Sequence, residues 1–166
     1  MGNLRSGDAE RSVPSFVMQE SEDHDRFEEA DLEQLALQWL RDICQNLDSP
    51  SDSGGAVVSM NFSASPEIQW RFILIAVVLA DTDLQLGHIA AGPIEHLLGW
   101  YGESYIDVIE NEAQSNPKFA RALTGVWQYM MTDEVWARVQ RLQENVSQPL
   151  EQLASDGTEH AGLAGE

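Results

Sequence analysis

The chain has 166 residues, 43% of them hydrophobic, and its 28 acidic and 9 basic side chains give a formal net charge of −19. A chain of this length is expected to fold as one domain with a sizeable core. The acidic balance argues against direct binding to nucleic acid or to an anionic membrane, since both require a basic surface, but it permits a basic protein partner.

Cysteine content and the apolar runs bear on where the protein works. The single cysteine, Cys44, excludes an internal disulfide and is compatible with a reducing cytoplasm. The N-terminal residues lack the continuous apolar stretch of a secretory signal. The longest apolar run, 72–80, is far shorter than the ~20 residues that span a bilayer. We therefore expect a cytoplasmic protein that does not enter a membrane.

Both ends of the chain differ in composition from its middle. Residues 1–28 are polar, lack periodicity and become strongly acidic toward the end, which predicts disorder. Residues 155–166 are rich in glycine and alanine and are expected to form a flexible tail. A single helical domain is predicted over 29–154. Within it, the segment 48–65 contains SPSDSGG and is predicted to be a loop.

The first two predicted helices have clear signals. Near Asp31–Asn46, apolar residues recur at i, i+3, i+4 and i+7, the pattern of one buried face. The second helix has Ser65 as its N-cap and Pro66 at its first position, and it continues through WRFILIAVVLA. Because this stretch is apolar all round, it predicts a central helix that is packed on several sides.

Three further helices are predicted between residues 83 and 114. The segment DLQLGHIAAGP follows a break at Thr82 and Asp83, and its helix is expected to end before Pro93. The next helix is predicted over Pro93–Tyr101, with Gly102 as its stop. Another follows at about 103–114.

Two C-terminal helices follow predicted caps. Asn116 caps a helix that begins with a proline, and its apolar stripe extends to Trp127 and Met130. Thr132 caps the last helix, whose first turn carries two acidic residues that suit its positive end. Trp127 is therefore expected in the core.

These elements predict an all-α fold, an irregular helical bundle of about six to seven helices. Short turns between helices favour antiparallel neighbours. Stacked helical hairpins are the alternative arrangement, although no repeated sequence unit indicates a solenoid.

One helix surface suggests a binding site for a partner. Glu103, Asp107 and Glu110 lie at i, i+4 and i+7, and like charges so spaced cost a few tenths of a kcal/mol per pair. A basic partner would relieve this repulsion and be steered to the surface. Trp100 lies off the apolar face of its helix, and an exposed tryptophan often anchors an interface. The alternatives are a solvated acidic face and a Trp100 that packs on the neighbouring helix.

A metal centre is the competing possibility. His88, Glu95 and His96, with Asp81 and Asp83 nearby, are residue types that bind zinc or iron. However, Glu95 and His96 are adjacent and point to different sides of their helix. The sequence contains neither a nucleophile elbow nor a phosphate-binding loop. We predict that the protein is not an enzyme and has no metal or cofactor, and we keep a small metal-dependent hydrolase as the alternative.

Several short motifs form a distinctive set. They are IAAGPIEHLL at 89–98, Gly102, the helix 106–113, NPKF at 116–119 and VWARV at 135–139. The set resembles a bacterial family of small α-helical domains with no assigned function, whose pattern is I-A-A-G-P-[IL]-E-x-L-L followed by V-W-x-R-V. The resemblance implies a bacterial source and a helical module, and it brings no known catalytic residues.

Taken together, these features predict a non-enzymatic, acidic protein-interaction module. An inhibitor or immunity-type protein that binds a basic toxin or nuclease is its most concrete form. The second alternative, beside the hydrolase, is a homo-oligomeric structural protein, for example a homodimer in which exposed apolar residues such as Trp100 and Trp136 pair about a two-fold axis.

Overall fold

A computed structural model of the protein describes residues 29–45 and 52–151, and every regular element within them is helical. This confirms the all-α prediction, while the predicted N-terminal segment 1–28 and the tail 155–166 lie outside the described residues. The elements are α1 (Glu29–Gln45), α2 (Ser53–Ser63), α3 (Pro66–Leu79), α4 (Asp83–Ile89), a π-helical turn η1 (Ala90–Ile94), α5 (Glu95–Ser115), α6 (Pro117–Leu123) and α7 (Asp133–Glu144).

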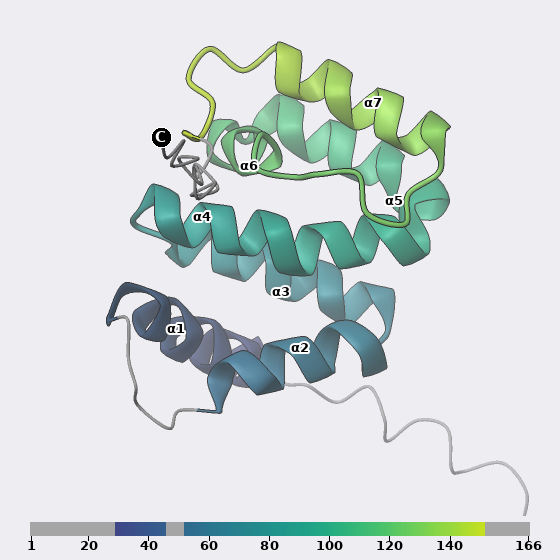
Figure 1. Ribbon diagram of the computed structural model, residues 1–166. Coiled ribbons are helices and arrows are strands. Elements are labelled where there is room, and N and C mark those ends of the chain that lie inside the picture. The colour runs from purple at the N-terminus through teal and green to yellow at the C-terminus, as the bar shows by residue number, and fades with distance from the viewer. Residues whose placement is uncertain (1–28, 46–51, 152–166) are drawn as a thin grey trace, which may run out of the picture.

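The helices pack as a bundle in three layers (Figure 1). Helices α1 and α2 form the lower layer, α3 and the run from α4 into η1 form the middle, and α6 and α7 lie above them. The later part of α5 joins the upper layer and contacts both α6 and α7. None of the described helices is both long and apolar enough to cross a bilayer.

Helix α3 occupies the centre, as its apolar sequence predicts. It contacts α1, α4, α5, α6 and η1, and Phe72 and Ile73 are fully buried. The Phe72 ring meets the buried Trp39 of α1 at 5.9 Å between centroids. The helix begins at Pro66 after the N-cap Ser65, although the Ser65 side chain makes no capping hydrogen bond. The apolar helix α3 therefore contacts both the lower and the upper layer.

The loop predicted over 48–65 is wrong for most of its length, because 53–63 form helix α2. Paired glycines and β-branched valines have low helix propensity, so the sequence of this segment does not predict a helix. Its buried residues Ser53, Val57, Met60 and Asn61 follow the spacing of one helical face. Packing of this face against α1 and η1 therefore overrides local propensity.

The helix break predicted around Pro93 is also wrong. Helices α4 and α5 are continuous through η1, whose wider turn accommodates Pro93. The break predicted at Gly102 is confirmed as a kink within α5, since Tyr101 has non-helical dihedrals (φ −128°, ψ 15°) and the helix resumes at Gly102. Tyr101 is exposed at this kink.

Helix α6 is shorter than its apolar stripe predicts. It ends at Leu123, and the Gln143 side chain of α7 donates hydrogen bonds to the carbonyls of Leu123 and Val126. Because these carbonyls find a partner outside the helix, the chain leaves it without exposing unsatisfied backbone. Trp127 is consequently 61% exposed, so its predicted burial is wrong.

Candidate interaction site

The segment 124–132 crosses the front of the molecule beside α5 in Figure 1 and forms one wall of the candidate site. Two residues of α5 hold it. Glu95 accepts a hydrogen bond at 2.8 Å from the backbone N–H of Trp127. One turn later, a Cβ at Gly99 would lie only 2.8 Å from the carbonyl oxygen of Tyr129, so only glycine allows this close approach. Met130 follows with a left-handed backbone (φ 53°), which is uncommon outside glycine.

A second close approach positions helix α7. A Cβ at Gly102 would meet Cγ1 of Val135 at 2.9 Å, which is shorter than an ordinary contact. The N-terminus of α7 is set by Thr132, whose hydroxyl accepts a hydrogen bond from the N–H of Val135, as the sequence predicts. The glycines of the α5 motif therefore bring the 124–132 segment and α7 against one side of α5.

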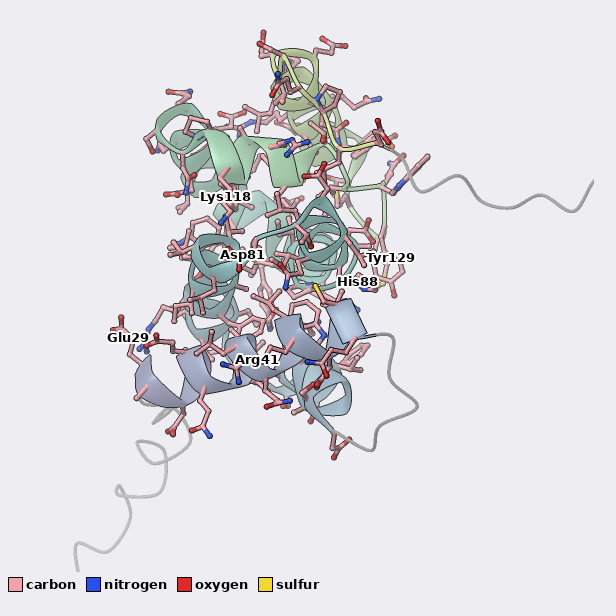
Figure 2. All side chains as sticks on the ribbon, turned by 90° about the vertical axis from the view of Figure 1, so that its left-hand side faces the viewer. Glu29, Arg41, Asp81, His88, Lys118 and Tyr129 are labelled. Atoms are coloured by element: carbon pink, nitrogen blue, oxygen red, sulfur yellow. The ribbon has the colours of Figure 1, made fainter. Side chains whose placement is uncertain are left out.

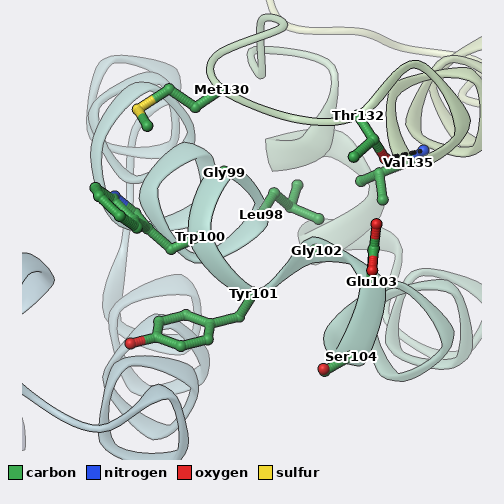
Figure 3. A pocket seen from close by; sticks show the side chains of 10 residues that line it. All are labelled: Leu98, Gly99, Trp100, Tyr101, Gly102, Glu103, Ser104, Met130, Thr132 and Val135. Atoms are coloured by element: carbon green, nitrogen blue, oxygen red, sulfur yellow. Dashed lines mark hydrogen bonds between the residues drawn. The ribbon is translucent and has the colours of Figure 1, made fainter.

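The space left between these elements is a hollow of about 200 Å³. Figure 3 shows the side chains that line it, with Trp100 and Met130 on one side and Glu103, Val135 and Thr132 on the other. Trp100 is 55% exposed and Met130 is 57% exposed. We call this site the Trp100 hollow and define it by Leu98, Trp100, Glu103, Met130, Thr132 and Val135.

Trp100 is exposed, as a residue at a binding interface would be, and is not packed away against a neighbouring helix. Further apolar surface continues beside it. The His96 ring, one turn earlier on α5, contacts the exposed Phe62 ring of α2 edge-on at 4.6 Å and the Tyr129 ring at 5.6 Å. Grouped exposed aromatic residues are unusual on a monomer surface and are typical of binding sites.

The three predicted acidic residues do not share one environment. Arg138 of α7 donates two hydrogen bonds to Glu110, at 2.7 and 2.5 Å, and one to Asp107 at 2.6 Å. The like-charge repulsion on this helix face is therefore relieved within the chain. Glu103 differs, since its carboxylate has no ion pair with any residue in 29–45 or 52–151. It is the member of the predicted row that lies in the Trp100 hollow.

The ion pair with Arg138 lowers the pKa of Glu110, chiefly through the hydrogen bonds from the guanidinium. A carboxyl with a lowered pKa stabilises the fold above its ordinary value of 4.5, and this contribution is lost as the pH falls through the folded pKa. We expect Arg138→Met to reduce the free energy of unfolding by about 1 kcal/mol at pH 7 and by less at pH 3. Urea denaturation at both pH values measures this, and an equal loss at both would contradict it.

Glu95 shows the opposite shift. Burial raises the pKa of its carboxyl, and the hydrogen bond from Trp127 opposes this only in part. A carboxyl with a raised pKa makes folding less favourable as the pH rises from 4.5 through the folded pKa. Glu95→Gln keeps an acceptor for the Trp127 N–H, so the variant should gain stability relative to the wild type between pH 4 and pH 7.

Thermal unfolding across that pH range tests this prediction. The exposed Glu144 provides the control, because Glu144→Gln changes the net charge equally without touching the 124–132 segment. A pH-dependent gain that is no larger for Glu95→Gln than for Glu144→Gln would contradict the prediction.

The residues of the metal alternative do not converge. Across the described part of the chain, no three histidine, cysteine or acidic side chains are placed to hold a metal ion. Glu95 holds the Trp127 backbone, and Asp83 forms a bidentate ion pair with Arg121 at 2.6 and 2.7 Å. Asp81 and His88 lie on the exposed surface (Figure 2). This geometry offers no support for the hydrolase that the sequence leaves open.

The sequence pattern does not indicate the second wall of the site. It predicts Met130 on a buried stripe and gives Tyr129 no role in binding, yet both residues are exposed beside α5. A signal for this was present in the two glycines of GWYG at 99–102, because glycines one turn apart on a helix allow close approach of backbone. Trp136, by contrast, is partly buried and packs against the core, so it is a poor candidate for a two-fold contact.

Fold and site together define a small all-helical protein with an aromatic and acidic hollow on its surface. The model of a family of unknown function, DUF6869, matches residues 44–147, which is more than half of the chain. The protein belongs to this family, and the match includes all of the motifs that carry the resemblance. No curated protein and no solved structure matches the chain significantly.

Proposed function

We propose that this protein is a non-enzymatic interaction module of bacterial cytoplasm that binds a basic protein partner through the Trp100 hollow. An inhibitor or immunity-type role toward a basic toxin or nuclease is its most concrete form. The net charge of −19 supports a basic partner, because a strong negative field speeds encounter with a positive surface. The bacterial source is inferred from the sequence resemblance.

One observation carries the proposal more than any other. Glu103 has an unpaired carboxylate within the described structure, and it lines the same hollow as the exposed Trp100. Tryptophan is enriched at interface hot spots, and a free carboxylate gives a basic partner a charge with which to pair. Asp107 and Glu110 contribute less directly, since Arg138 already pairs with them, but Asp107 remains 80% exposed and adds negative potential beside the site.

The same charge argues against the homo-oligomer. Two copies that met through their exposed aromatic residues would bring two chains of charge −19 together, and their mutual repulsion opposes association. A basic partner converts this repulsion into attraction. The surface is therefore better suited to a different protein than to a second copy of this chain.

Capture of partners in the native host tests the proposal. The tagged full chain is cross-linked in cells and purified at low salt, and bound proteins are identified by mass spectrometry. Trp100→Ala and Glu103→Gln are compared with two controls, Val78→Ala and Glu144→Gln, which remove an exposed apolar side chain and an equal charge away from the site.

We expect a basic protein that the wild type and both controls retain, and that Trp100→Ala and Glu103→Gln reduce at least tenfold, in line with hot-spot losses of about 1.4 kcal/mol or more. Raising the salt concentration should also release it. If every basic protein were retained equally by site and control variants, the proposal would be wrong.

A further inference from the structure

The Trp100 hollow is too small for an ordinary metabolite. Its volume of about 200 Å³ lies below the roughly 300–1,000 Å³ of pockets that enclose small-molecule ligands. A single long side chain is the kind of group that a hollow of this size accepts.

The walls divide into an apolar and a charged part. Trp100, Met130 and Val135 present an indole ring, a thioether and a branched aliphatic group. Glu103 supplies a carboxylate with no ion pair to any described residue. An apolar stem that ends in a cation matches both parts.

We infer that the Trp100 hollow receives an arginine side chain from the partner, with its stem across Trp100 and Met130 and its guanidinium on Glu103. Arginine is favoured over lysine because its planar head pairs with a carboxylate through two parallel hydrogen bonds and stacks on aromatic rings. This inference rests on the proposed function and specifies the chemistry of the same site.

The remaining charges of the site agree with this occupant. Arg138 of α7 contacts α5 in this region and forms ion pairs with Asp107 and Glu110. It is therefore held away from Glu103 by two carboxylates that already bind it. The guanidinium of a partner can pair with the Glu103 carboxylate as that of Arg138 pairs with the Glu110 carboxylate.

The test uses the ¹⁵N-labelled full chain and the five indole N–H signals of its tryptophans. The Trp100 signal is assigned with Trp100→Phe. The probes are three blocked tripeptides, acetyl-Gly-X-Gly-amide, in which X is arginine, lysine or citrulline. Citrulline has nearly the shape of arginine but no charge, so it separates charge from shape. Titrations are run at low salt, where screening is weakest.

We expect the arginine peptide to shift the Trp100 signal saturably and the other four signals little. Citrulline should bind at least tenfold more weakly and lysine should fall between them. Glu103→Gln should weaken arginine binding roughly tenfold, as for loss of a charge-assisted hydrogen bond, while Glu144→Gln should leave it unchanged. Unchanged positions of the other indole signals show that each variant is folded.

Three results would overturn the inference: equal binding of arginine and citrulline, equal effects of the Glu103 and Glu144 variants, or shifts spread evenly over all five indoles. These results are separable from failure of the proposed function. A captured partner that depends on Trp100 and Glu103, without an arginine response, would leave the interaction standing and remove arginine as its ligand. If the arginine peptide bound but no such partner were captured, arginine binding would stand and the proposed interaction would lose its support.

Discussion

Replacing Phe119 by alanine is expected to lower the free energy of unfolding by about 3–5 kcal/mol, whereas Trp100→Ala should change it by less than about 0.5 kcal/mol. Phe119 is fully buried, and its ring meets Trp70 of α3 edge-on at 5.6 Å. Its helix α6 contacts α3, α4, α5, α7 and η1, so the cavity would open where most elements meet. The surrounding backbone has little freedom to close it.

Trp100 provides the contrast because it is an even larger aromatic residue whose ring is mostly in solvent. Urea denaturation of both variants, with unchanged slopes, measures the two losses. A loss above 2 kcal/mol for Trp100→Ala would mean that this ring supports the fold, and the binding role assigned to it would lose its basis. A loss below 1 kcal/mol for Phe119→Ala would contradict the packing of α6.

Replacing Gly102 by alanine is expected to destabilise the protein by about 1–2 kcal/mol, even though alanine favours helices. Helix propensity alone would add up to about 1 kcal/mol of stability. Against this, the new Cβ would lie 2.9 Å from Cγ1 of the buried Val135, and such overpacking typically costs about 1–3 kcal/mol. The branched Val135 side chain cannot rotate out of the contact, so α7 itself must shift.

Gly87 in α4 is the matched control. No atom lies within 4 Å of a Cβ built there, so Gly87→Ala should raise stability by up to about 1 kcal/mol. Opposite signs for the two substitutions, measured by chemical denaturation, would show that close approach requires the glycine at 102. If Gly102→Ala were as stable as Gly87→Ala, α7 would not pack against α5 as described.

Helices α1, α3 and α7 were predictable. They lie within a few residues of their predicted bounds, because the local sequence pattern and the burial of apolar side chains indicate the same element. Helix α2 lacked that agreement. Its glycines and valines disfavour a helix locally, and only contact with α1 and η1 makes it favourable.

The break predicted at Pro93 failed for a related reason, whereas the one predicted at Gly102 corresponds to a kink within α5. Proline and glycine indicate a helix end reliably only when they have no other structural role in the fold. Here η1 accommodates Pro93, and Gly102 serves close packing against Val135 rather than a left-handed turn. A sequence pattern does not distinguish a glycine that ends a helix from one that admits a neighbour, since both uses require only a missing Cβ.

Some features of the candidate site were also predictable from the sequence, and others were not. Its acidic row and its exposed Trp100 were visible in the sequence, because spacing along one helix determines which side chains share a face. What the sequence could not assign was the partner of each charge. Arg138 lies 28 residues after Glu110, and only the packing of α7 on α5 shows that it engages Glu110 and Asp107 but not Glu103.

The amino-acid sequence alone determined that the protein is acidic, helical and held together by amphipathic faces, since charge and periodicity are local properties of the chain. Tertiary structure alone decided where helices end, which carboxylate is left unpaired and that Met130 stands beside Trp100. Those outcomes depend on contacts between residues far apart in the chain. Such contacts are set by how the helices pack and not by any one helix.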